Sequence, residues 1–181
     1  MPEILHLASF ETPIGPCRVA STSTGLAHLE LPRAAGRGLP GFCRSQLPDA
    51  LLVDGYEPNR AAIRQILEFL GAKRQRFELP LDLRGTPFQR AVWQALLAIP
   101  YGETRSYADV AAAVGRPRAT RAVGSSNGAN PLPLVVPCHR VVASGGGLGG
   151  YAGGAALKAR LLAMERDALS GLQRPETGRL L

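Results

Sequence analysis

Cys138 and His139 are neighbours in the segment PLVVPCHRVVASGGG, between a proline and an arginine. A thiolate is a strong nucleophile, and an adjacent imidazole can take the thiol proton or stabilise the anion. Buried free cysteines are common and mostly inert, so core packing, metal binding and nucleophilic catalysis are the three alternatives. The strand propensity of PLVVPC, which Pro137 ends, predicts Cys138 at the end of an element, and Gly145–Gly150 predict a flexible wall near it. These features favour a nucleophile.

A metal site and a cysteine hydrolase are less well supported. The other candidate ligands have neither C-x-x-C nor H-x-x-x-H spacing: Cys17, Cys43, His6 and His28. A cysteine hydrolase normally uses an oxyanion hole and a histidine distant in sequence, whereas adjacent side chains point in different directions. We therefore expect a water between Cys138 and His139 rather than a direct hydrogen bond.

The composition predicts a globular cytoplasmic protein. Hydrophobic residues make up 45% of the 181 residues, and no apolar run approaches the roughly 20 residues that span a bilayer. The start, MPEILHLASFETP, lacks the basic and apolar blocks of an export signal. Three widely spaced cysteines suit a reducing compartment.

The positive charge is concentrated in one part of the chain. The formal net charge is +7, and the segment from Val110 to Met164 contains no Asp or Glu. Six of the seven net charges come from its basic residues, which are Arg116, Arg118, Arg121, Arg140, Lys158 and Arg160. A field of one sign predicts a polyanionic partner such as DNA or RNA, with a chance excess of arginine as the alternative.

The first 84 residues predict strands and one helix, with a boundary near Gly85. Turn signals such as TPIGP separate the apolar runs. The predicted elements are strands at 4–10, 17–21 and 26–31, a long Pro/Gly-rich surface connection at 32–58, a helix from Asn59 to Gly71 and an extended segment at 77–85.

Short helices are predicted after Gly85. Thr86 and Gln89 form a capping box, and Ser106 caps a second helix that Gly115 and Pro117 end. A third helix follows at once in the segment RATRAVGSSN. Two short helices around a tight turn that contains glycine predict a helix-turn-helix, whose second helix can enter a DNA groove.

Three segments resemble the O6-alkylguanine-DNA alkyltransferase family: PCHRV, RAVGSSNGANP and PYGETRSYADVA. The resemblance is dense from about Arg84 to Glu165 and thinner before it, where TPIG and LDLRGTPFQ still fit. It implies an α+β fold. An N-terminal, ribonuclease-H-like α/β domain would span residues 1–84, a helical winged helix-turn-helix domain with the reactive cysteine 85–170, and a flexible tail 171–181.

The resemblance also implies residue roles. Cys138 would accept the alkyl group, His139 would take its proton through a water, and Glu165 would orient that relay. Asn130 would hold the active-site turn. The residues that would contact DNA or line the guanine pocket are Tyr107, which presses on the nucleotide's phosphate, Arg121, which fills the vacated stack, and Arg116, Arg118, Val141, Tyr151 and Ala152.

The implied activity is the repair of alkylated guanine in double-stranded DNA, with thymine O4 as a second candidate lesion. A thioether has no good leaving group, so a monomer would be consumed without a cofactor. Some relatives hold a structural zinc, but Thr22 and Ala27 occupy ligand positions here, so we expect none. Met164 and Ala152 replace a histidine and a serine of some relatives, which leaves the tolerated alkyl size open.

Two alternatives share the fold. A lesion-binding relative without activity would lack the cysteine. A winged-helix transcription factor would explain the basic segment, although not Pro-Cys-His-Arg, and would bind one DNA sequence.

Overall fold

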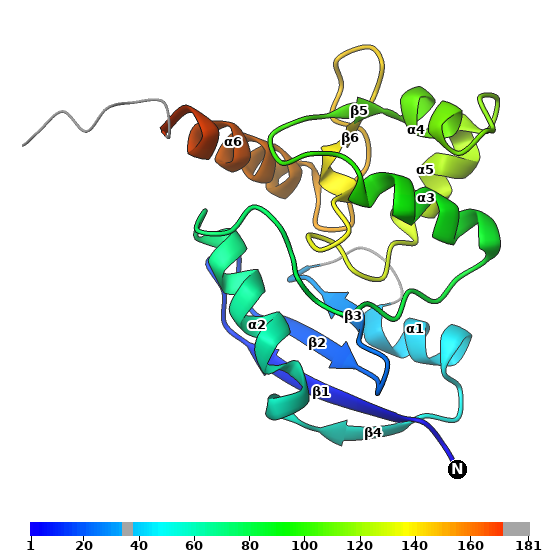
Figure 1. Cartoon of the computed structure of the whole chain (residues 1–181), viewed down its shortest axis with the longest axis vertical. Helices are drawn as coiled ribbons and strands as arrows, with labels where there is room; N and C mark the ends of the chain where they lie inside the picture. Colours follow the sequence, from blue (N-terminus) through cyan, green and yellow to red (C-terminus); the bar gives the residue numbers. More distant parts are fainter. Residues whose placement is uncertain (34–37, 172–181) are drawn as a thin grey trace, which may run out of the picture.

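The computed structural model describes residues 1–33 and 38–171. Residues 34–37 and 172–181 lie outside this part, and with them almost all of the predicted tail. A sheet forms one half of the described molecule and a group of helices the other (Figure 1). The predicted α+β fold is thereby confirmed.

Four strands form the N-terminal sheet in the order β3-β2-β1-β4. They are β1 (Ile4–Phe10), β2 (Cys17–Ser21), β3 (Leu26–Glu30) and β4 (Leu51–Asp54). The first three pair antiparallel, and β4 pairs parallel with β1. Helix α2 (Tyr56–Leu70) packs on β1 and β2, while α1 (Gly38–Gln46) contacts β3.

The predicted long connection between residues 32 and 58 is wrong. Its described part contains α1 and β4, and Leu39 and Phe42 of α1 are buried in a cluster with Leu5 of β1. Helix α1 forms because the sheet provides a surface that buries its apolar side chains, whereas β4, whose residues are exposed, is held by its pairing with β1. Helix α2 begins before Asn59, since Pro58 lies in its first turn, where the missing N–H has no intrahelical partner.

The second half consists of short helices around a two-stranded sheet. Its elements are α3 (Pro87–Leu97), β5 (Arg105–Ser106), α4 (Tyr107–Ala113), α5 (Thr120–Gly128), the 3-10 turn η1 (Cys138–Arg140), β6 (Val141–Val142) and α6 (Ala155–Gly171). Thr86 and Ser106 both form capping boxes, as predicted. Helices α4 and α5 pack together and make the helix-turn-helix, while β5 pairs with β6.

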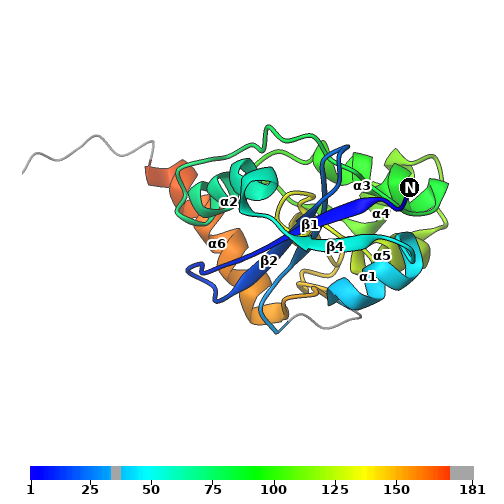
Figure 2. The same cartoon turned by 90° about the horizontal axis from the view of Figure 1, so that it is seen from below.

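The two halves share one hydrophobic core. Val19 and Leu29 of the sheet belong to the same buried cluster as Trp93 and Val123 of the helices. In the view of Figure 2, which looks at the molecule from the side of the sheet, the strands lie in front of the helical half. The division into domains at residues 84 and 85 stays a prediction.

No helix within residues 1–33 and 38–171 combines the length and the apolar character that a membrane span requires.

Candidate active site

Cys138 is the first residue of η1, and only 2% of its surface is exposed. The segment before it, Leu132–Val136, is buried but forms turns, so the strand predicted for PLVVPC is wrong. Pro133 and Val136 form only an isolated bridge with each other, and Leu134 between them has a φ of 75°, which is incompatible with an extended chain. The structure therefore presents Cys138 from a compact turn at the centre of the helical half.

Two asparagines hold this turn. The Asn130 Nδ2 donates to the carbonyl of Val136 at 2.9 Å, and its Oδ1 accepts from the backbone N–H of Leu132 at 2.9 Å. Asn127 Nδ2 donates to the carbonyl of Cys138 at 3.3 Å. Both ends of the turn are thus tied to the end of α5 and the residues just after it, which limits movement of the thiol.

His139 is fully buried, and its ring contacts α6. Its Nε2 lies 2.7 Å from Oε1 of Glu165, which is also fully buried. Among the described residues no group forms a hydrogen bond with Nδ1 of His139. Since a carboxylate can only accept, Nε2 carries the proton in the neutral ring and Nδ1 has the free lone pair.

Arg140 forms a fork on the same carboxylate. Its Nε lies 3.1 and 3.0 Å from the two oxygens of Glu165, and its Nη2 lies 3.0 Å from Oε1. A further N–H of Arg140 donates to the carbonyl of Ile99 at 2.7 Å. Glu165 also accepts from the backbone N–H of Gly102 at 2.8 Å. The negative charge of Glu165 is therefore already compensated by Arg140, which is always protonated, while His139 is still neutral.

Burial controls ionisation at this site. It raises the pKa of Cys138 to about 11, while hydrogen bonding from Asn130 and the charge of Lys158 act in the opposite direction. Burial also lowers the pKa of His139, against the attraction of Glu165. At neutral pH the resting pair is a thiol and a neutral imidazole, so a reaction at sulfur needs a base to take the proton.

Tyr107, Val141 and Tyr151 surround the turn. The ring of Tyr107 lies 6.0 Å from Nζ of Lys158, and that ammonium donates to the carbonyl of Val141 at 2.5 Å. The Tyr151 ring lies 6.3 Å from the His139 ring. Gly149, with a φ of 72°, lets the loop approach Tyr107, because a Cβ there would lie 2.9 Å from its Cε2. These contacts bring two predicted pocket residues, Val141 and Tyr151, and the predicted phosphate-contacting Tyr107 close to the reactive turn.

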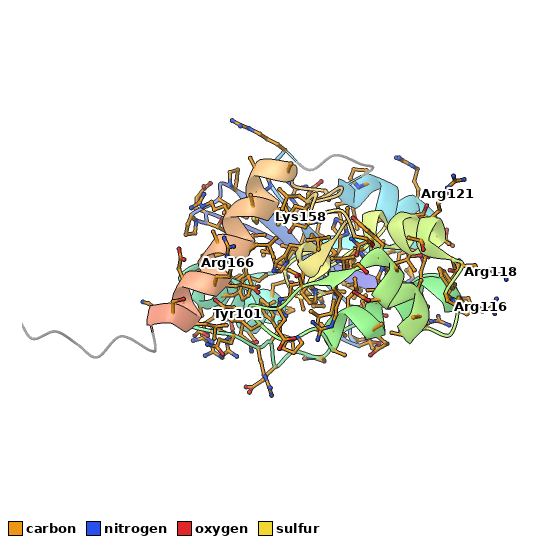
Figure 3. The ribbon with its side chains drawn as sticks, turned by 90° about the horizontal axis from the view of Figure 1, so that it is seen from above. Tyr101, Arg116, Arg118, Arg121, Lys158 and Arg166 are labelled. Carbon is orange, nitrogen blue, oxygen red and sulfur yellow. The ribbon has the colours of Figure 1, made fainter. Side chains whose placement is uncertain are left out.

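Arg116, Arg118 and Arg121 are exposed around the turn between α4 and α5. Their side chains project from one end of the molecule, away from Lys158 and Arg166 on α6 (Figure 3). A cluster of free guanidinium groups at the start of the second helix is suited to contacts with DNA phosphates and to entry into a groove.

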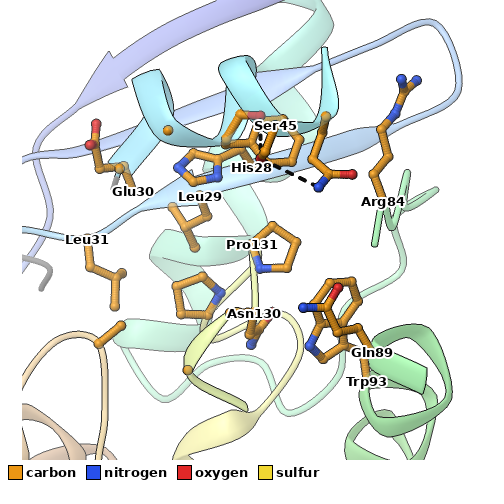
Figure 4. A pocket seen from close by; sticks show the side chains of 18 of the residues that line it. His28, Leu29, Glu30, Leu31, Ser45, Arg84, Gln89, Trp93, Asn130 and Pro131 are labelled. Carbon is orange, nitrogen blue, oxygen red and sulfur yellow. Dashed lines mark hydrogen bonds between the residues drawn. The ribbon is translucent and has the colours of Figure 1, made fainter. Parts of the chain in front are cut away.

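Ala152 lies in a different wall from the other predicted pocket residues. It lines a cavity of about 530 Å³ between β3, α1 and the segment Asn130–Pro133. His28, Trp93 and Pro131 line the same cavity (Figure 4). The role of Ala152 in a guanine pocket remains a prediction.

Three residues of the site were missed by the sequence-based prediction: Asn127, Arg140 and Lys158. Three features of the sequence bear on them. Arg140 directly follows His139, and Glu165 is the first acidic residue after the acid-free segment. Lys158, Leu161 and Glu165 are also spaced to share one face of α6, and all three are buried.

The candidate metal positions have other partners. Thr22 donates to Oδ2 of Asp82 at 2.7 Å, and Arg84 Nη2 bridges that oxygen at 2.7 Å and Glu3 Oε1 at 2.6 Å. Ala27 is buried. Within the described ranges, no three His, Cys, Asp or Glu residues gather in a way that could hold a metal ion. The metal content of the protein stays a prediction.

Comparison with known proteins identifies close relatives. Residues 87–167 match the family model described as 6-O-methylguanine DNA methyltransferase, DNA binding domain. The methylated-DNA–protein-cysteine methyltransferase of Methanosarcina barkeri is 43% identical over 88% of this chain and 96% of its own length. The enzyme of that name from Mycobacterium tuberculosis is 38% identical over 91% of this chain and 94% of its own.

A solved structure agrees with these relatives. The crystal structure of Mycobacterium tuberculosis OGT in complex with DNA is 38% identical in sequence and superposes with a TM-score of 0.78. The match covers 90% of this chain and 94% of that one. Because the match covers nearly the whole chain, it includes both the sheet half and the helical half. The chain belongs to the methylated-DNA–protein-cysteine methyltransferase family.

Proposed function

We propose that this protein repairs DNA by moving an alkyl group from O6 of guanine to Cys138, once per molecule and without a cofactor. The observation that carries the proposal is the buried thiol beside the complete network of His139, Glu165 and Arg140. The relatives are named for transfer to a protein cysteine. A lesion-binding protein without activity would have no use for this thiol.

DNA recognition falls to residues 85–170, which we treat as the DNA-binding and alkyl-acceptor domain. Arg116 and Arg118 would contact phosphates, and α5 would approach a groove of the duplex. The O6 atom is out of reach in a stacked pair, so the nucleotide must flip at a cost of a few kcal/mol. Arg121 would fill the vacated position, and Tyr107 would press on the rotated phosphate.

Proton transfer precedes bond formation. A water between Cys138 and His139 would carry the thiol proton to Nδ1, the ring nitrogen without a partner in the described structure. The imidazolium that forms is stabilised by Glu165, whose carboxylate accepts from Nε2. Arg140 keeps that carboxylate in position during the transfer.

Alkyl transfer is a direct displacement. A sulfur lone pair forms the S–C bond, the C–O bond breaks, and its electron pair moves to the purine oxygen. The purine anion takes up a proton from water and becomes guanine, and His139 releases to water the proton that it took from the thiol. The thioether has no good leaving group, so each protein molecule reacts once. The same displacement is open to O4 of thymine.

The proposal also includes the state of the protein. One chain supplies every group named above, so we propose that a monomer acts. It would work in the cytoplasm on chromosomal DNA.

Incubation with an excess of duplex that contains O6-methylguanine tests the function. We expect mole-for-mole consumption, with one added methyl on the peptide that contains VVPCHR and none on the peptides of Cys17 and Cys43. Cys138→Ser should bind the duplex and transfer nothing, because a hydroxyl lacks the acidity of a thiol. Sustained turnover, or methylation of another cysteine, would refute the proposal.

A further inference from the structure

The ring of His139 has one hydrogen-bond partner among the described residues. Its Nε2 donates to Oε1 of Glu165 at 2.7 Å, whereas no group in the described ranges bonds to Nδ1. One hydrogen bond fixes the position of one ring atom and leaves the ring able to tilt and turn about that bond. Nδ1 is the atom that would receive the thiol proton, so the packing around the ring must set its direction.

Phe69 supplies part of that packing from the sheet half. It lies in the last turn of α2, which runs from the sheet toward the helical half (Figure 1). Its exposed fraction is 0%, and its ring centroid lies 6.1 Å from that of His139, with the two planes at 62°. This is the edge-to-face arrangement that aromatic pairs prefer. Helix α2 thus contacts the proposed base of the reaction directly.

The same phenyl ring also contacts the support of Arg140. Phe69 packs edge-on against Tyr101, with centroids 6.0 Å apart and planes at 89°. The guanidinium carbon of Arg140 lies 5.5 Å from the centre of that Tyr101 ring, where a cation is attracted to the aromatic face. Phe77 packs against Phe69 with a centroid distance of 5.2 Å and limits its movement. One side chain of the sheet half therefore borders both His139 and the group beneath Arg140.

We propose that Phe69 is a positioning residue, which holds the ring of His139 in the orientation that lets Nδ1 take the thiol proton. The sheet half thereby becomes part of the proton relay. The inference rests on the proposed alkyl transfer. Phe69 itself exchanges no proton and forms no bond. Without its ring, His139 can still reach Glu165, but it samples tilts in which Nδ1 is misdirected, and water gains access to the bond with the carboxylate.

Two substitutions separate this role from a general loss of packing. Phe69→Leu removes the phenyl ring and keeps an apolar side chain. Phe42→Leu is the matched control, because Phe42 is also a buried phenylalanine whose ring stacks on a histidine, His28, at a centroid distance of 4.9 Å. Phe42 belongs to a separate hydrophobic cluster from Phe69. Each change removes one phenyl ring from beside one histidine, and the relay contains only the second of these histidines, His139.

The first measurement is NMR of the full chain labelled with nitrogen-15 in histidine, at neutral pH. The chain contains three histidines, so replacing one at a time assigns every signal. In the wild type, His139 should have a protonated Nε2, an unprotonated Nδ1 and a slowly exchanging Nε2 proton, because its bond to Glu165 is buried.

The two variants should change different signals. In Phe69→Leu, a ring that can turn lets either nitrogen donate to Glu165. The two nitrogen signals of His139 should therefore move toward each other, and the Nε2 proton should exchange faster. Phe42→Leu should change the signals of His28 and leave those of His139 as they are. A general loosening of the core would not select one histidine in this way.

The second measurement is the rate of methyl transfer from free O6-methylguanine, which avoids any effect on DNA binding. The orientational preference of one aromatic pair corresponds to a population ratio of roughly 2 to 10. Phe69→Leu should therefore react about 2- to 10-fold more slowly. The loss should appear in the maximal rate and not in the half-saturating concentration of the base, since the guanine pocket is unchanged. Phe42→Leu should react as the wild type does.

The outcomes separate this inference from the proposed function. If the wild type methylates Cys138 but Phe69→Leu keeps either the wild-type signals of His139 or the wild-type rate, Phe69 is not a positioning residue. An equal loss of rate in Phe42→Leu would overturn the inference as well. If the signals of His139 change in Phe69→Leu while the wild type never acquires a methyl group, the proposed function fails and the control of the ring by Phe69 stands. Should Phe69→Leu fail to fold, Phe69→Met carries the same comparison, because its flexible side chain fills irregular space.

Discussion

Glu165→Gln is the most informative single change, because Glu165 connects the reactive turn to the rest of the helical half. Burial by itself would raise the pKa of this carboxyl, but hydrogen bonds from His139 and Arg140 lower it from 4.5 to about 2. Each pKa unit corresponds to about 1.4 kcal/mol, so the shift is worth about 3 kcal/mol of folding free energy. Removing one partner of a buried ion pair costs about 3–5 kcal/mol by comparison with other proteins. The two values agree.

Thermal melting and single-turnover kinetics together measure the effect. For a chain of this size about 3–5 kcal/mol lowers the melting temperature by roughly 10 °C. Loss of the charge that stabilises a protonated His139 should also slow methyl transfer by a factor on the order of 10² to 10⁴. The matched control is the double variant Arg140→Met/Glu165→Gln, which removes the unpaired cation. We expect it to regain stability but not rate.

A melting temperature that falls while the rate stays at the wild-type value would refute the relay. Glu165 would then only hold Arg140 and the turn at Gly102. If the double variant regained both the melting temperature and the rate of methyl transfer, the Glu165 carboxylate would likewise have no role in the chemistry.

The remaining predictions concern acid, DNA and metal. Because the folded pKa of Glu165 lies below its unfolded value, its contribution is complete above pH 4.5 and is lost as the pH falls toward about 2; melting across this range should show a loss of about 3 kcal/mol, smaller in the double variant. Affinity for undamaged duplex should fall steeply with salt, since arginines that contact phosphates release counterions; a flat salt dependence would exclude them. Arg121→Ala should slow repair of paired lesions more than reaction with the free modified base, and equal losses would remove its role in the stack. Elemental analysis should find less than one equivalent of zinc, and chelators should leave melting unchanged; one full equivalent would contradict the assignment of Thr22 and Ala27.

Local patterns in the sequence predicted the helical half well. The capping boxes at Thr86 and Ser106 depend on contacts across three residues, and the structure contains both. The helix-turn-helix likewise follows from Gly115 and the short apolar faces beside it. Its second helix begins at Thr120, two residues later than predicted. Such features need no distant partner, so the residues alone carry the information.

Elements that depend on a distant surface could not be predicted in this way. Helix α1 and strand β4 have weak propensity and form because the sheet buries or pairs them. The segment before Cys138 has the residues of a strand, yet its prolines and the positive φ of Leu134 make it a turn. Burial against the core, not propensity, sets the conformation there.

The sequence by itself determined the reactive pair, the family and the concentration of positive charge near the second helix of the helix-turn-helix. Only the tertiary structure decided the electrostatics of the site. Arg140 and Glu165 are 25 residues apart, and their fork forms because α6 packs against η1. The same packing buries Lys158 beside two carbonyls. The charge pattern along the chain does not show which charged side chains are buried. Burial is what strengthens the electrostatic influence of such side chains on the ionisation of Cys138.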